Sequence, residues 1–218
     1  MQKSSIMKKT NVKVVRELTQ VWIYTGEVVM TDDTRQALEQ ALPATVRHRQ
    51  AGRPHCTRDR ALLAYTALLT KAKAFVPNAD EALCFTDRGK PYFVPKNALY
   101  CSLSHTDTAI AIALSTQPVG VDVQTITPVR EVVVNRVFTA RERSAMAFVP
   151  PGEGARLFTR IWAQKEAALK KSGLGIAGLR HIPPEPGIYT IQEGADWVAA
   201  VCAEETAVIE LRDIGEGI

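Results

Sequence analysis

Apolar positions along the chain follow two different periods, and each period predicts one kind of element. Alternation with a period of two, or a short apolar run between turn residues, predicts strands over 12–29, 84–94, 99–115, 119–124 and 197–214. Apolar residues at helical spacing predict helices over 31–42, 57–75, 129–138, 139–148 and 153–172. The last strand pair is expected to form a closing hairpin. Strands and helices occur in similar proportion on both sides of residue 118. The order therefore predicts an α+β protein of two similar subdomains, 1–118 and 119–218, each a small antiparallel sheet packed with helices.

Capping residues mark several helix ends. Asp32 or Asp33 is expected as the N-cap of the first helix, and Thr139 with Glu142 fits a capping box. The segment 173–178, Gly-Leu-Gly-Ile-Ala-Gly, has the glycine spacing of a dinucleotide fingerprint. A fingerprint needs a strand before it and a helix after it, whereas here a helix ends into it. We interpret it as a helix C-cap that begins at Gly173.

Composition excludes several classes of protein. The 218 residues are 46% hydrophobic and 23% charged, which is not typical of a disordered chain, a coiled coil or collagen. No apolar run approaches the roughly 20 residues of a membrane span, so no membrane association is expected. The lysines at the N-terminus precede no apolar stretch, so a secretory signal is not expected either. The cysteines contain no C-x-x-C pair, which favours reduced thiols in a cytoplasmic protein: Cys56, Cys84, Cys101 and Cys202.

Basic residues are concentrated in the first half of the chain. Residues 1–118 hold 16 Lys and Arg against 10 Asp and Glu, and residues 119–218 hold 11 against 13. Much of the excess comes from Arg47, Arg49, Arg53, Arg58 and Arg60. The segment is either a solvated basic loop and helix start or an anion site, since clustered guanidinium groups bind phosphates. It lacks the aromatic residues of a stacking platform, so we expect no nucleic-acid partner.

The predicted strand over 119–124 places oxygen-bearing side chains on one face. Gly120, Asp122 and Gln124 alternate with valines and therefore face the same side. Asp122 and Gln124 are roughly 7 Å apart along such a strand, a spacing that suits two ligands of one hard cation. The alternative is a half-exposed strand whose polar side chains face water.

The predicted helix over 153–172 carries charges beside its apolar arc. The arc consists of Leu157, Ile161, Trp162, Ala168 and Leu169. Lys165 projects into this arc, and Glu166 lies at its edge, four residues before Lys170. Glu166 and Lys170 either form a surface ion pair or line a cleft with Asp122. In a cleft, two carboxylates with adjacent lysines would suit a magnesium–phosphate site.

Five motifs in this chain resemble those of the 4'-phosphopantetheinyl transferases, in the surfactin-synthetase-activating (Sfp-like) branch. The family patterns are G-K-P, N-[IL]-S-H-[ST], G-[IV]-D-[IV]-E, F-[ST]-x-x-E and W-x-x-K-E-[SA]-x-x-K. In that order they resemble residues 89–91, 102–106, 120–124, 138–142 and 162–170. The resemblance spans about residues 47–175.

The resemblance implies a function. Such enzymes transfer the 4'-phosphopantetheine group of coenzyme A to a serine of an apo acyl or peptidyl carrier protein and release adenosine 3',5'-bisphosphate. It implies two pseudo-symmetric subdomains with coenzyme A, the co-substrate, between them. The expected partners are acidic carrier proteins. Because two fused halves would complete one site, we expect a monomer.

The resemblance also implies a set of catalytic and metal-binding residues. Mg²⁺ is the expected cofactor, held by Asp122, Glu166 and Gln124. Glu166 would accept the proton of the carrier serine. Lys170, with Lys165 near it, would contact the phosphates of coenzyme A and stabilise the departing one.

A second group of residues is expected to bind the adenosine 3'-phosphate of coenzyme A. This group comprises Lys90, Ser104, His105, Arg49 and Arg53. His105 is also expected among the catalytic residues. Its alternative is a hairpin-turn histidine bonded to nearby backbone.

The chain departs from the family patterns at two positions. Gln124 stands where glutamate is common, which removes one negative charge from the expected metal site, and Ser102 stands where asparagine is usual. Gln124 favours a rival interpretation, a module that binds coenzyme A or a nucleotide without transferring anything. A third interpretation is a protein that only docks acidic carrier domains.

Overall fold

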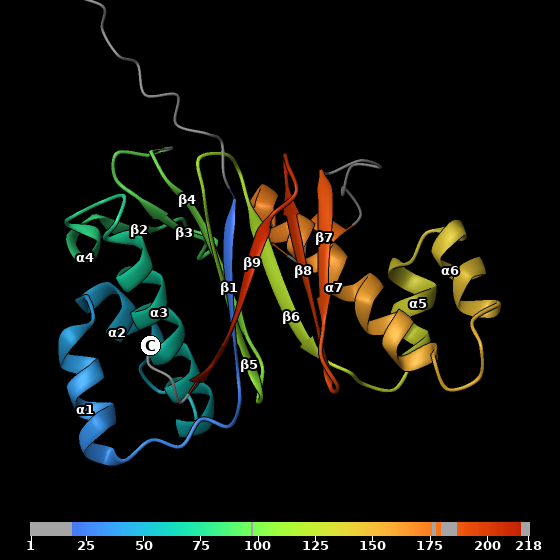
Figure 1. The fold of residues 1–218 in the computed structure, drawn as a ribbon, viewed down its shortest axis with the longest axis horizontal. Helices are drawn as coiled ribbons and strands as arrows, with labels where there is room; N and C mark the ends of the chain where they lie inside the picture. The colour runs from blue at the N-terminus through green and yellow to red at the C-terminus, as the bar shows by residue number, and fades with distance from the viewer. Residues whose placement is uncertain (1–18, 97, 176–177, 180–186, 215–218) are drawn as a thin grey trace, which may run out of the picture.

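Two β-sheets face each other at the centre of the molecule, and helices cover the outer face of each (Figure 1). The computed structural model describes residues 19–96, 98–175, 178–179 and 187–214. The N-terminal segment and the first part of the strand predicted over 12–29 lie outside the described residues. The mixture of helices and small sheets confirms the α+β class.

Within the described residues, the first sheet has four strands in the order β4-β5-β1-β9 and the second has three in the order β6-β8-β7. The first comprises β4 (Tyr100–His105), β5 (Ala109–Ser115), β1 (Gln20–Thr25) and β9 (Val208–Asp213). The second comprises β6 (Gly120–Thr125), β8 (Trp197–Ala203) and β7 (Ile188–Glu193). A separate hairpin joins β2 (Leu83–Phe85) and β3 (Pro91–Phe93). The pairs β4–β5, β5–β1, β6–β8 and β7–β8 are antiparallel.

The closing hairpin predicted over 197–214 is wrong. β8 pairs with β6 and β7, whereas β9 runs parallel to β1 in the other sheet. Contacts at the start of β9 direct it there: the Val208 amide donates to the Thr19 carbonyl (2.9 Å), and Glu205 accepts from the Thr19 amide (3.0 Å). β7 was not predicted. A strand of residues 208–213 thus lies in the sheet of the N-terminal half, and the division of the chain at residue 118 stays a prediction.

Small side chains allow the two sheets to approach each other closely. The inner faces meet through Val21, Ile23, Ala109, Ala111, Ala113, Val119, Val121, Val123, Ala199 and Val201. The opposite face of the first sheet packs its larger residues, including Trp22, Tyr24 and Ile112, against a helix. Because strand side chains alternate between faces, each strand serves two cores.

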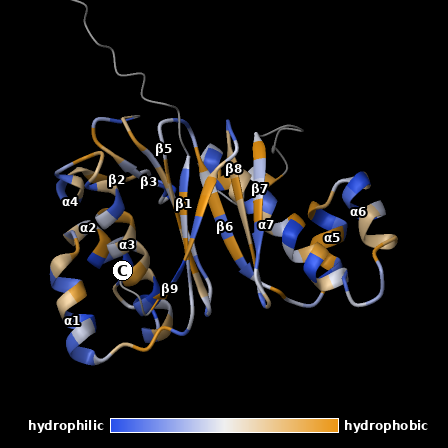
Figure 2. Ribbon diagram, viewed as in Figure 1, coloured by the Kyte–Doolittle hydropathy of each residue, from blue (hydrophilic) through white to orange (hydrophobic). Residues whose placement is uncertain are grey.

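Helices form the outer layers. The first sheet is covered by α1 (Asp32–Ala41), α2 (Ala44–Gln50), α3 (His55–Ala72) and α4 (Ala79–Ala82). Beside the second sheet lie α5 (Glu131–Val137), α6 (Ala140–Ala147) and α7 (Gly154–Ser172), of which α5 and α6 project from the body of the molecule (Figure 1). Outer helices such as α1 and α5 carry both hydrophilic and hydrophobic residues (Figure 2). None of the helices in the described ranges is long and apolar enough to cross a membrane.

The predicted capping box of Thr139 and the end of α7 at Gly173 are confirmed, whereas the predicted N-cap of α1 is wrong. Its N-cap is Thr31, whose side chain accepts a hydrogen bond from the Thr34 amide, so the expectation of Asp32 or Asp33 is wrong. Thr31 has the extended backbone of an N-cap, which leaves the two aspartates in the first turn. The capping box of Thr139 is present, and α7 ends at Gly173 with φ of 72°.

Candidate active site

Asp122 is at the centre of the site, at the seam where β4 of one sheet meets β6 of the other. Its side chain is buried, with 1% relative exposure. Its Oδ1 accepts hydrogen bonds from Ser104 Oγ (2.8 Å) and Lys170 Nζ (2.6 Å), and its Oδ2 accepts one from Gln124 Nε2 (2.7 Å). The carboxylate thus accepts three hydrogen bonds, one of them from a cation.

Gly120 allows α7 to lie directly over β6. A Cβ at this position would overlap the carbonyl oxygen of Ala167 and the amide nitrogen of Lys171. The missing side chain therefore brings the α7 backbone against the strand that carries Asp122. This close approach places Glu166 and Lys170, on the same side of the helix, beside the aspartate.

Glu166 is the titratable group of the site. Its pKa is raised to about 7, chiefly by burial and also by the neighbouring charge of Asp122, whereas Lys170 lowers it. The ammonium group of Lys170 also donates to the Leu103 carbonyl at 3.3 Å. A carboxyl group whose pKa lies near neutral pH is suited to accept a proton during a reaction.

The acidic residues fit a magnesium ion bound together with phosphates. In the described part of the chain, no group of three or more His, Cys, Asp or Glu residues could hold a metal. Mg²⁺, however, is commonly held by one or two carboxylates plus substrate phosphates. The charge of Asp122 raises the pKa of the Glu166 carboxyl group, and a bound cation would relieve this repulsion. The amide of Gln124 donates to Asp122, so only its Oε1 could act as a ligand.

A cleft of about 260 Å³ opens beside these residues. Glu166, Lys170, Leu103 and Tyr65 line it together with the turn that contains Gly89. The cleft is thus bounded by α7 from one half of the chain and by α3, β4 and the β2–β3 hairpin from the other. A molecule bound here would contact both halves.

Lys90 also lines this cleft, but its ammonium group points at the end of α7. It donates to the carbonyl oxygens of Lys170 (2.5 Å) and Lys171 (2.6 Å). Burial lowers its pKa to about 8. Its predicted contact with coenzyme A stays a prediction.

His105 is surrounded by cations. Its pKa is lowered to about 4, chiefly by burial and also by the charges of Lys170, Arg53 and Arg60. The imidazole is therefore neutral at pH 7, where it can donate one hydrogen bond and accept another. The cationic surroundings would favour an anion near His105. The phosphate site expected here stays a prediction.

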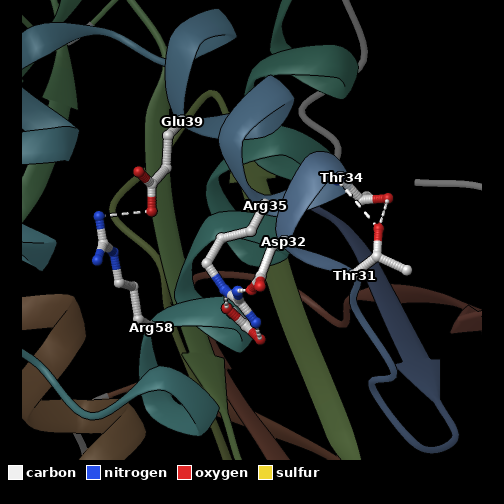
Figure 3. Close-up of polar contacts among 7 residues, drawn as sticks. Thr31, Asp32, Thr34, Arg35, Glu39 and Arg58 are labelled. Carbon is white, nitrogen blue, oxygen red and sulfur yellow. Dashed lines mark hydrogen bonds and ion pairs between the residues drawn. The ribbon is translucent and has the colours of Figure 1, made fainter.

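The arginines of the basic segment 47–60 lie in different environments. Arg58 forms an ion pair with Glu39 of α1 at 2.5 Å (Figure 3), and Arg60 pairs with Asp107 at 2.7 Å. Arg49 lies over the ring of Phe85, 4.6 Å from its centroid.

Arg35 of α1 forms two further ion pairs beside this segment, which the sequence analysis missed. Arg35 pairs with Asp32 (Figure 3) and, at 2.6 Å, with Asp59 of α3. The structure thus turns Arg58 toward α1 and leaves Arg53 and Arg60 close enough to affect His105.

Lys165 is not brought together with Asp122. It is buried and forms a 2.8 Å ion pair with Glu142 of α6, 5.8 Å from the centroid of the Phe138 ring. Glu142 also closes the capping box by accepting from the Thr139 amide at 2.6 Å. The expected capping role of Glu142 is therefore confirmed, and its carboxylate also compensates the charge of a buried lysine, which was not predicted.

The sequence analysis also missed the contacts that β4 makes with β6. Ser102 Oγ accepts from the Val121 amide at 3.0 Å, and Ser104 Oγ donates to Asp122. Two serines with a spacing of two on a predicted strand indicate a polar face. What that face meets depends on how the two sheets are arranged.

Comparisons with known proteins agree with this geometry. Residues 118–203 match the model of the 4'-phosphopantetheinyl transferase superfamily. Over 123 residues, 55% of this chain, it is 34% identical to "4'-phosphopantetheinyl transferase AcpT" of Escherichia coli (strain K12), covering 61% of that protein. Over 113 residues, 47% of this chain, it is 31% identical to "4'-phosphopantetheinyl transferase HetI" of Nostoc sp., covering 48% of that protein. With "4'-phosphopantetheinyl transferase Sfp" of Bacillus subtilis (strain 168), identity is 26% over 89 residues, 41% of this chain and 40% of that one.

These matches cover less than two thirds of the length of the relatives. The matched segment nevertheless contains β6 and α7, which carry Asp122, Glu166 and Lys170. Through residues 118–203, the chain is similar to the 4'-phosphopantetheinyl transferase superfamily.

Proposed function

We propose that this protein transfers the 4'-phosphopantetheine group of coenzyme A to a serine of an apo acyl or peptidyl carrier protein. In this reaction a bond forms between the serine oxygen and the β-phosphorus of coenzyme A. The bond from that phosphorus to the bridging oxygen breaks, and adenosine 3',5'-bisphosphate leaves.

One observation carries the proposal: Asp122, Glu166 and Lys170 meet at a cleft lined by both halves of the chain. A displacement at phosphorus needs a group that accepts the proton of the nucleophile and cations that stabilise the departing oxygen. Here a carboxyl group with a pKa of about 7 stands next to an ammonium group. The superfamily match lies on the same two elements.

The residues of the chain divide the work. Glu166, in its ionised form, accepts the proton of the serine hydroxyl. Lys170 stabilises the negative charge on the departing phosphate. Arg53 and Arg60 attract the 3'-phosphate toward His105, whose neutral ring contributes a hydrogen bond.

Asp122 and Glu166 would hold Mg²⁺, with Gln124 Oε1 as a further oxygen. The ion, when bound, neutralises charge on the phosphate oxygens. Ser104 keeps the Asp122 carboxylate oriented through its 2.8 Å hydrogen bond. Charge neutralisation and positioning would thus supply most of the rate.

The proposal is tested by intact-mass spectrometry of an apo acyl carrier protein incubated with this protein, coenzyme A and Mg²⁺. We expect a mass increase of one phosphopantetheine that is lost with EDTA. An apo peptidyl carrier provides the second substrate. If neither carrier gains mass while coenzyme A binds, the proposal is wrong.

The second candidate is a module that binds coenzyme A or a nucleotide without group transfer. Its supporting observation is the hydrogen bond that the Gln124 amide donates to Asp122. A carboxylate at position 124 could have supplied a third acidic metal ligand, whereas the amide supplies a donor. It predicts binding that does not change with Mg²⁺ and no modified carrier. Gln124→Glu would then be the variant to examine for gained transfer.

A further inference from the structure

We propose that Lys90 is a positioning residue: from the β2–β3 hairpin, its ammonium group holds the C-terminal end of α7 and thereby fixes Lys170 and Glu166 against Asp122. This inference rests on the proposed function for its effect on turnover. Its structural part concerns the folded protein alone.

The first line of evidence is the set of acceptors around the ammonium group. Lys90 Nζ lies 2.5 Å from the Lys170 carbonyl oxygen, 2.6 Å from that of Lys171 and 3.5 Å from that of Val119. The carbonyls of Lys170 and Lys171 belong to the last turn of α7, where backbone acceptors have no partner within the helix. A cation at this end also interacts favourably with the helix dipole.

The second line of evidence is the packing of the Lys90 stem. Gly173, the C-cap of α7, has φ of 72°. A Cβ there would stand 3.4 Å from Lys90 Cδ, so the stem crosses directly over the helix end. The side chain is thus held along its length and at its tip. Such a side chain resists displacement more than a lysine that reaches into solvent.

The third line of evidence is the anchoring of Lys90 on its own side. Its amide donates to Thr86 Oγ1 at 3.0 Å, and Thr86 in turn closes the turn by accepting from the Gly89 amide at 2.8 Å. Gly89 has φ of 82°, which suits a glycine in this tight turn. The hairpin therefore presents Lys90 to α7 as a fixed point.

The consequence concerns Lys170, whose backbone carbonyl and side chain are held by different partners. Its carbonyl accepts from Lys90, and its side chain donates to Asp122 at 2.6 Å. Glu166 lies one turn earlier on the same helix. Misplacement of a catalytic group by about 1 Å can cost about 100-fold in rate. Release of the helix end would therefore lower turnover, whereas a direct ligand of coenzyme A would chiefly affect binding.

The experiment compares Lys90→Met with Lys96→Met. Methionine keeps most of the stem and removes the ammonium group. Lys96 is the matched control because it is exposed and lies over the Tyr92 ring, at 5.8 Å from its centroid. Lys96 lines the neighbouring cavity, and its replacement by methionine removes the same charge.

We expect Lys90→Met to lower kcat by about tenfold to 100-fold while the KM for coenzyme A changes by less than about threefold. Hydrogen exchange of the amides at 169–173 should accelerate by about tenfold or more in this variant, and not in Lys96→Met. A raised KM with unchanged kcat and unchanged exchange would overturn the proposal and make Lys90 a direct ligand. If the wild-type protein transfers nothing, the proposed function fails, and exchange alone decides the role of Lys90.

The wild-type protein provides a test that does not depend on the variant folding. The titratable groups that face Lys90 are Cys101 of β4, whose pKa burial raises to about 12, and Lys171 of α7. Nuclear magnetic resonance shifts of the Lys171 and Ser172 amides, which follow the two acceptor carbonyls, should change with a midpoint near pH 8. Amide shifts that do not change when Lys90 loses its proton would contradict the contact.

Discussion

Two lysines on α7, Lys165 and Lys170, each form an ion pair with a carboxylate from another element, yet their surroundings differ. In the pair with Glu142 the lysine is the more buried partner, with side-chain exposures of 10% and 28%. In the pair with Asp122 the carboxylate is the more buried partner, at 1%, and the lysine is 30% exposed. Only the second lysine borders the cleft.

The difference shows how one helix can serve stability on one face and chemistry on another. Lys165 is enclosed by Glu142 of α6, which compensates its charge, and by Phe138 at the end of α5, whose ring lies against it. Its loss would leave a charge without its partner. Lys170 has a partly exposed side chain and lies beside a carboxyl group with a raised pKa, Glu166. That arrangement is typical of functional sites.

The largest effect should come from the face of α7 that borders the cleft. We expect Glu166→Gln to lower transfer by about 10²- to 10⁴-fold because the variant cannot accept the serine proton. The measurement is the rate of mass gain of an apo carrier. Asp122→Ala should lose transfer as well as the response to Mg²⁺. Near-wild-type transfer by folded Glu166→Gln would remove the distinction between the two faces.

A second large effect is expected where α7 lies on β6. Gly120→Ala should lower both stability, by about 1 to 3 kcal/mol or more, and transfer, because the added methyl group must push the helix away. Thermal unfolding and transfer assays check this. Gly154→Ala is the matched control, since a Cβ there would meet Val129 at 3.7 Å, an ordinary contact. Equal behaviour of the two variants would contradict the close approach.

A smaller effect is expected from Lys165, on the face of α7 that packs against α6. Lys165→Met should lower the free energy of unfolding by about 1 to 2 kcal/mol. The Glu142 carboxylate would keep its capping hydrogen bond to the Thr139 amide but lose its ion-pair partner. Transfer and the KM for coenzyme A should change by less than about threefold. A KM raised tenfold or more would instead assign Lys165 to coenzyme A, as the sequence analysis expected.

The smallest effect concerns pH. Because the pKa of Glu166 is raised to about 7 in the folded protein, the folded state binds its proton more tightly than the unfolded state does. Its contribution to stability is thus fully present below the unfolded pKa near 4.5 and is lost as pH rises through about 7. Glu166→Gln should therefore raise Tm at pH 8 by roughly 2 to 4 °C relative to wild type. At pH 4 this advantage should vanish, and an equal gain at both values would exclude ionisation as its cause.

Much of the site could be predicted because its signals are local. Strand alternation placed Asp122 and Gln124 on one face, and helical spacing placed Glu166 and Lys170 one turn apart. The motif resemblance then joined these two elements. Long-range contacts could not be predicted in this way. The hydrogen bond from Gln124 to Asp122 and the Lys90 contact with α7 depend on atoms that meet only in the folded chain.

The sequence by itself determined the α+β class, most helix and strand positions, and the two elements that carry the site, because periodicity and capping act over a few residues. Only the tertiary structure decided which partner each element met. It paired β9 with β1, Lys165 with Glu142 and Lys170 with Asp122. Partner choice follows from packing two sheets and a helix at once. In that packing Gly120 sets the helix distance and burial sets the pKa of Glu166.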